Sequence, residues 1–140
     1  MIFLLSLFFI ILIHELGHFF AAKICKCGVD EFAIGFGKTI FQKRIGKVLY
    51  KLNILPLGGY VKLQDELTFS RSKYAFVNQT YKEKVFIALA GVLVNIISGL
   101  LAYYIGWNFD IYFLRVFAIY SVIIGLTNAL PIPALDGSYP

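Results

Sequence analysis

The stretch Ile11-Leu12-Ile13-His14-Glu15-Leu16-Gly17-His18-Phe19-Phe20 places two histidines and a glutamate inside an otherwise apolar run. An ionisable side chain at membrane depth costs about 2.5–3.5 kcal/mol on insertion scales, so such side chains usually mark a functional site. Residues four apart lie one helical turn above each other, which lets His14 and His18 present ring nitrogens to one metal ion. Glu15 lies off that line and can reach a metal-bound water as general base. The alternative, that the histidines only hydrogen-bond to neighbouring helices, leaves Glu15 without a role.

The composition is that of a membrane protein. The chain has 140 residues, of which 59% are hydrophobic and 15% charged, and its mean hydropathy is +0.78, far too apolar for an ordinary soluble domain. Twelve of the thirteen Lys and Arg residues lie between Lys23 and Lys84. By the positive-inside rule, this segment is expected in the cytoplasm, attracted to anionic headgroups. The net charge of +5 therefore requires no nucleic-acid partner.

Three apolar stretches, residues 2–22, 85–105 and 112–130, are long enough to be transmembrane helices. The first has no basic residues before its apolar run and carries the His/Glu cluster, so we interpret it as a retained span rather than a removed signal peptide. The predicted fold is a single domain with an all-α membrane core. It crosses the cell inner (cytoplasmic) membrane several times, with the lipid bilayer as a partner and the site toward the cytoplasmic side.

Residues 29–62 change to short β-branched and aromatic runs broken by glycine, which predicts a small membrane-associated β-hairpin or sheet. Turns are expected at residues 44–47 and 56–59. The sheet is either structural or offers an edge that holds a substrate peptide extended by strand addition. Residues 64–84 are expected to form a polar interfacial connection to the second span.

The third span leads into a loop, residues 128–137, in which two prolines stop an ordinary helix. Irregular backbone at membrane depth is tolerated only where it is buried in protein or lines a watery cavity. Asp136 lies in this loop, and the topology brings it to the side of the two histidines, so it is the candidate third metal ligand. Asn95, in the second span, is either interhelical glue or a hydrogen-bond donor to a substrate carbonyl.

Five segments in this order resemble the site-2 protease family of intramembrane zinc metalloproteases, peptidase family M50. They are His14-Glu15-Leu16-Gly17-His18-Phe19, Ile34-Gly35-Phe36-Gly37-Lys38, Pro56-Leu57-Gly58-Gly59-Tyr60-Val61-Lys62, Ala90-Gly91-Val92-Leu93-Val94-Asn95 and Asn128-x-x-Pro131-x-Pro133-x-x-Asp136-Gly137. The resemblance implies a zinc ion held by His14, His18 and Asp136. It also implies that Glu15 activates the water that attacks a peptide carbonyl.

The same resemblance implies regulated intramembrane proteolysis of a transmembrane protein substrate, beside a membrane-reentrant β-hairpin. The residues expected to hold the unwound substrate are Asn95, Asn128, Gly58 and Gly59. The sequence differs from the family in having Ser138 where a second glycine is usual and Val92 where proline is frequent. With no PDZ-sized insertion between the second and third spans and an end at Pro140, a short, C-terminally truncated form is expected.

Two alternatives remain open at this point. One is another His-Glu-x-x-His membrane protease, whose third ligand would be Glu31, Glu66 or Glu83, although these lie in strand-like or interfacial segments. The other is a non-catalytic paralogue that binds membrane partners through the β segment. The sequence carries no signal for the oligomeric state.

Overall fold

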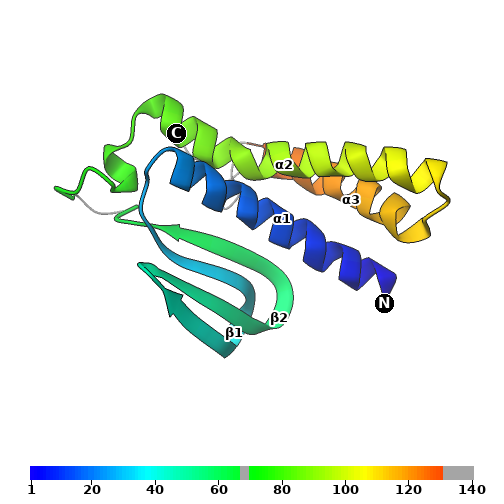
Figure 1. Ribbon diagram of the computed structural model, residues 1–140, viewed down its shortest axis with the longest axis horizontal. Coiled ribbons are helices and arrows are strands. Elements are labelled where there is room, and N and C mark those ends of the chain that lie inside the picture. Colours follow the sequence, from blue (N-terminus) through cyan, green and yellow to red (C-terminus); the bar gives the residue numbers. More distant parts are fainter. Residues whose placement is uncertain (67–69, 131–140) are drawn as a thin grey trace.

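The computed structural model describes residues 1–66 and 70–130. Its elements are helix α1 (Ile2–Ile24), strands β1 (Val29–Ile45) and β2 (Val48–Leu63), the short 3-10 helix η1 (Phe76–Asn78), and helices α2 (Tyr81–Asn108) and α3 (Tyr112–Asn128). Helix α1 packs against α2, α3 and both strands, and it lies between the other two helices and the sheet (Figure 1). The order predicted for these elements is confirmed.

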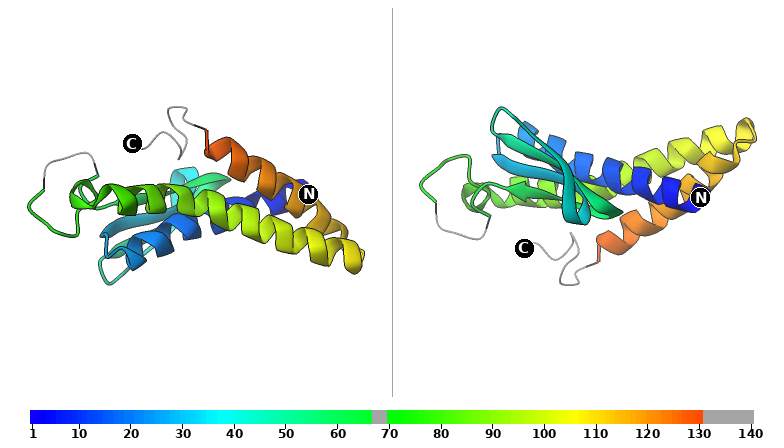
Figure 2. Two further views of the ribbon diagram at one scale, coloured as in Figure 1. Left: turned by 90° about the horizontal axis from the view of Figure 1, so that it is seen from above. Right: turned by 90° about the horizontal axis from the view of Figure 1, so that it is seen from below.

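The three helices alternate in direction. Helix α2 runs opposite to α1, and α3 runs back in the direction of α1, as the views in Figure 2 also show. The C-terminal half of α3 therefore approaches the C-terminal half of α1. One contact demonstrates this, because the Asn128 side chain lies 3.4 Å from the ring of His14. This is the arrangement that the alternating topology predicts.

Two of the three helices have the length and apolar composition needed to cross a membrane. These are α1, with 23 residues, and α2, with 28. Helix α3 is a shorter apolar helix of 17 residues, below the roughly 20 residues that a span requires. The prediction of three transmembrane helices is therefore supported for two. Large apolar side chains are exposed on the outer surface of α2, among them Leu100, Leu101 and Tyr104, as a lipid-facing helix requires.

Helix α2 begins at Tyr81, before the span predicted from Val85, because a capping box defines its first turn. The Thr80 hydroxyl accepts a hydrogen bond from the backbone N–H of Glu83, and the Glu83 carboxylate accepts one from the backbone N–H of Thr80. These bonds satisfy backbone donors that a helix N-terminus leaves unpaired. The polar connection predicted for residues 64–84 thus ends in the first turn of α2.

The two strands form an antiparallel two-stranded sheet that folds back on itself. The turn expected at residues 44–47 is confirmed, since β1 ends at Ile45, β2 begins at Val48 and Gly46 has a φ of 61°. The break expected at residues 56–59 is wrong, because β2 continues to Leu63. Pairing explains the continuity, since residues 31–34 of β1 are paired with both residues 49–52 and residues 59–62 of β2.

The larger apolar core joins the C-terminal half of α1 to the sheet and to the start of α2. Phe19 of α1 is at its centre, with its ring against those of Phe32 and Tyr50. Val48, next to the sheet's turn, is buried in the same cluster. A second cluster around Ile10 holds the three helices together nearer the N-terminal half of α1. The sheet is therefore fixed beside the half of α1 that carries the histidines.

We predict that Cys27 reacts slowly with alkylating reagents. Its side chain is 3% exposed, and burial, with the nearby Cys25 thiol and acidic side chains adding to it, raises the pKa of the Cys27 thiol from 9.0 to about 11. The alkylation rate by iodoacetamide should therefore rise with pH toward a midpoint near 11, because the thiolate is the nucleophile. Mass spectrometry with the half-exposed Cys25 as internal reference measures this. Equal rates at neutral pH would contradict the prediction.

The same shift has a consequence for stability. The folded chain keeps the proton of Cys27 up to about pH 11, whereas the unfolded thiol loses it near its ordinary value. The free energy of unfolding should therefore fall as pH rises from about 9 to about 11. A Cys27→Ala variant lacks this pH dependence and serves as the control.

Candidate metal centre

The site is built on a close crossing of α1 and α2. Gly17 of α1 lies against the α2 backbone, where a Cβ at this position would come within 2.8 Å of the Ala90 carbonyl oxygen and 2.9 Å of the Gly91 Cα. Small residues at such crossings let two helix backbones approach closely. This approach brings the α2 backbone to the level of the two histidines, because His14 lies three residues before Gly17 in α1 and His18 lies one residue after it.

His14 and His18 point their rings at one location. Their Nε2 atoms are 3.2 Å apart, and the rings meet edge to face with centroids 4.8 Å apart. Two imidazole nitrogens bound to one zinc ion at about 2.0–2.1 Å, with a tetrahedral angle between them, would be separated by about 3.3 Å. The observed separation therefore fits a shared metal ion.

Gly91 provides the space for that ion. A Cβ on Gly91 would lie 2.4 Å from Nε2 of His18 and 2.8 Å from Nε2 of His14. Any side chain at this position would occupy the region toward which the two ring nitrogens converge. The two imidazole nitrogens and the space beside Gly91 thus fit a zinc ion. The sequence alone predicts Gly91 only as a small residue at a helix contact, so its role beside the histidines was missed.

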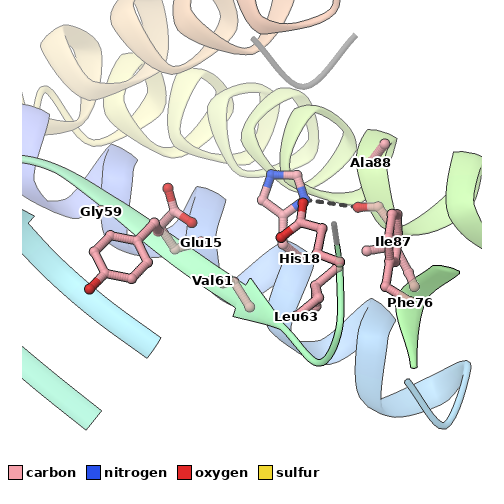
Figure 3. Close-up of a pocket in the computed structure, with 10 residues that line it drawn as sticks. Glu15, His18, Gly59, Val61, Leu63, Phe76, Ile87 and Ala88 are labelled. Carbon is pink, nitrogen blue, oxygen red and sulfur yellow. Dashed lines mark hydrogen bonds between the residues drawn. The ribbon is translucent and has the colours of Figure 1, made fainter. Parts of the chain in front are cut away.

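The Nδ1 atom of each histidine contacts a polar group of α2. Nδ1 of His18 donates to the backbone carbonyl of Ile87 at 2.8 Å, the bond drawn in Figure 3. Nδ1 of His14 lies 3.1 Å from the side-chain amide of Asn95. Such outer contacts orient a ligand ring and select which nitrogen faces the metal. The contact with Ile87 was missed from the sequence, because every residue type offers the same carbonyl.

Glu15 lies on a different side of α1, against the sheet. A Cβ on Gly59 of β2 would come within 2.8 Å of Cγ of Glu15. Both residues, with His18, line a pocket of about 150 Å³ between α1, β2 and the first turns of α2 (Figure 3). The Glu15 carboxylate thus lies beside the pocket, one residue away from the two histidines along α1.

The predicted substrate residues have different surroundings. Gly59 lines the pocket, whereas Gly58 lies under the ring of Phe36, whose Cε2 would be 2.0 Å from a Cβ. Asn128 reaches Nε2 of His14 at 3.4 Å. Asn95 is completely buried and is not among the residues that line the pocket. The structure thus brings Gly59 and Asn128 to the site and places Asn95 behind it.

The third metal ligand predicted from the sequence, Asp136, lies outside the described residues. Within residues 1–66 and 70–130, no group of three His, Cys, Asp or Glu side chains is arranged to hold a metal ion. Of the alternative ligands, Glu31 accepts hydrogen bonds from Lys51 at 2.8 Å and Tyr60 at 3.1 Å, and these bonds hold its pKa below the ordinary value. Glu83 caps α2, whereas Glu66 lines the pocket.

A helix that carries His-Glu-x-x-His, with space for a metal ion between the two histidine rings, is typical of zinc metallopeptidases. The chain belongs to peptidase family M50, whose model matches residues 2–111.

Several curated proteins are similar to it. The regulator of sigma-E protease RseP of Salmonella typhimurium is 37% identical over 109 residues, which are 74% of this chain and 24% of that protein. A protein of Clostridium perfringens provisionally named as a zinc metalloprotease is 40% identical over 103 residues, 71% of this chain and 30% of that protein. A similarly named protein of Neisseria meningitidis is 33% identical over 117 residues, 81% of this chain and 26% of that protein. The chain spans about a quarter of the length of these relatives.

We predict that Gly91→Ala weakens zinc binding without unfolding the helices. The added Cβ would press on both Nε2 atoms, so the zinc dissociation constant should rise about tenfold or more, as for other disturbances that misorient ligands. Chelator competition measures the constant, and circular dichroism reports the helices. Gly99→Ala is the matched control, because its nearest neighbour is the Val122 side chain of α3. Equal zinc affinity in Gly91→Ala and wild type would contradict the assignment of the space beside Gly91 to the metal ion.

Proposed function

We propose that the chain is the catalytic core of a zinc-dependent intramembrane endopeptidase that cleaves transmembrane segments of membrane proteins. The observation that carries the proposal is the convergence of the two Nε2 atoms on Gly91, with Glu15 at the adjoining pocket. Membership of family M50 and the names of the relatives support it.

The proposed ligands are His14, His18 and Asp136. Asn128, at the end of α3, already reaches the His14 ring, and Asp136 follows it by eight residues, a length of chain that can span up to about 27 Å. Asp136 is therefore within reach of the two histidines. Glu66 is the alternative ligand, supported by its place in the wall of the pocket.

Bound zinc would polarise the scissile carbonyl and lower the pKa of water at the site toward about 7. The chain's own residues do the remaining work. Glu15 takes the proton of the attacking water on its carboxylate and delivers it to the leaving amine. The Nδ1 contacts made by Ile87 and Asn95 keep the two rings in place during the reaction.

The substrate must be unwound before it can react, because the peptide groups of a helix are hydrogen-bonded internally and shielded. Residues 59–63 of β2 pair with β1 on one side, and Gly59, Tyr60, Val61 and Leu63 line the pocket. We assign this strand the task of holding the unwound segment extended by strand addition. Gly59 leaves room for it beside Glu15, and Asn128 is placed to bind a substrate carbonyl.

The proposed location is the inner membrane, with the site toward the cytoplasm. Twelve of the thirteen Lys and Arg residues lie from Lys23, in the last turn of α1, to Lys84, before the apolar part of α2, and positive residues favour the cytoplasmic side. The two histidines lie in the half of α1 that adjoins this basic segment. Water can therefore reach the pocket from the cytoplasmic side without crossing the whole bilayer.

Replacing Glu15 by Gln should abolish cleavage of a transmembrane reporter by the chain in nanodiscs while leaving bound zinc unchanged. The amide keeps the shape of the side chain but cannot take a proton from water. Cleavage products on gels and zinc by atomic absorption measure the two effects. Glu31→Gln, the same change at the ion pair with Lys51, is the control and should cleave normally. Cleavage by Glu15→Gln at the wild-type rate would overturn the proposal, and zinc binding without cleavage in wild type would favour a non-catalytic paralogue.

The third ligand is decided by a second pair of variants. Asp136→Ala should lose zinc, since two imidazoles alone make a weak site, whereas Glu66→Ala should retain one zinc per chain. Stoichiometry is measured by metal analysis after dialysis. The reverse result would assign the ligand to Glu66.

A further inference from the structure

Asn95 occupies a junction of all three helices. It is one of the fully buried side chains of the described structure. Its backbone carbonyl accepts hydrogen bonds from Ser121 of α3 at 2.9 Å and from Ser98 of α2 at 3.2 Å. Gly125 of α3 lies so close that a Cβ there would be 3.2 Å from Cβ of Asn95. Helix α3 thus packs against one side of Asn95, and the Asn95 side chain contacts His14 of α1.

The hydrogen-bonding capacity of His14 restricts what Asn95 can do. A neutral imidazole has one donor nitrogen and one acceptor nitrogen. Nitrogen Nδ2 of Asn95 faces Nδ1 of His14 at 3.1 Å, and Nδ2 of Asn128 faces Nε2 of the same ring at 3.4 Å. Both amides cannot donate to one neutral ring, so the orientation of each depends on which nitrogen of His14 carries the proton.

Metal binding would determine the orientation of the Asn95 side-chain amide. A histidine that ligates through Nε2 carries its proton on Nδ1, and that proton needs an acceptor. A half-turn of the Asn95 amide places Oδ1 against Nδ1 of His14. Oδ1 has no hydrogen-bond partner among the residues that the structure describes, so no bond there holds the amide in the opposite orientation.

The other proposed ligand, His18, also has an acceptor beside its Nδ1 atom, and this acceptor is a backbone carbonyl. Nδ1 of His18 faces the backbone carbonyl of Ile87 at 2.8 Å, and a carbonyl can only accept. His18 is therefore held with Nδ1 protonated and Nε2 available to the metal. Asn95 lies eight residues beyond Ile87 on the same helix, a little over two helical turns, and its Oδ1 would complete the pair of acceptors.

From this geometry we infer that Asn95 is a positioning residue whose Oδ1 accepts the Nδ1 proton of His14 and holds Nε2 toward the zinc ion. The inference rests on the zinc site of the proposed function and adds a residue to it. It assigns Asn95 to the metal centre rather than to simple helix packing or to contact with substrate. Its full burial and its absence from the lining of the described pocket agree with this assignment.

The test compares Asn95→Leu, which removes the acceptor and keeps the number of side-chain heavy atoms, with Asn95→Asp, which keeps the acceptor, in the full chain in nanodiscs. The readouts are the zinc dissociation constant by chelator competition and the visible spectrum of the cobalt-substituted protein. Asn95→Leu should bind zinc about 10–100-fold more weakly and change the cobalt spectrum, as expected for loss of an outer-shell partner. Asn95→Asp should bind within about threefold of wild type or more tightly, because a carboxylate raises the basicity of the ligand ring.

Ser98→Ala is the matched control. It removes a polar contact to the backbone of Asn95 and leaves the amide in place, so its zinc affinity should equal that of wild type. Asn95→Leu with wild-type affinity, or Asn95→Asp weakened more than tenfold, overturns the inference. If Asn95→Leu does not fold, Asn95→Asp alone decides by the same criterion. Absence of zinc from wild type would instead overturn the proposed function, so the two failures are distinguishable.

Discussion

The close approach of α1 and α2 at Gly17 is the constraint on which the site depends. With the Ala90 carbonyl and the Gly91 Cα less than 3 Å from where a Cβ would be, the two backbones cannot come nearer, and any larger residue would hold them apart. The carbonyl of Ile87 and the amide of Asn95 can reach the two imidazoles only at this separation. The same small residues that pack the helices therefore also determine the geometry of the proposed metal ligands.

The surroundings of the histidines explain how polar groups are tolerated in this apolar helix. An imidazole buried without partners would cost several kcal/mol. His14 is only 6% exposed, yet both of its ring nitrogens have polar neighbours, from α1, α2 and α3. His18 has Ile87 and His14. The groups that compensate for burial are thus the groups that orient the rings, so the stability of the packing and the geometry of the proposed metal site arise from the same contacts.

Most of the arrangement could be predicted from local pattern, and the remainder required contacts between distant residues. The length of the apolar stretches predicted the helices, and the spacing of four residues predicted that His14 and His18 lie side by side. The continuity of β2 through residues 56–59 could not be foreseen, because pairing with β1 overrides the local turn signal of proline and glycine. The contact between Asn95 and His14 joins positions 81 residues apart, and no local pattern distinguishes it from ordinary interhelical glue.

The position of Glu15 shows why a one-residue offset matters in this fold. Successive residues of an α-helix are rotated by about 100°, so Glu15 cannot share the face of His14 and His18. In a helix surrounded by lipid that rotation would expose a carboxylate, but α1 has α2 on one side and β2 on another. The histidines therefore face the helix that supplies their hydrogen-bonding partners, and Glu15 faces Gly59 at the edge of the pocket. The sheet thus forms a second wall beside α1, so that the proposed metal ligand His14 and the proposed base Glu15 occupy adjacent positions of one helix.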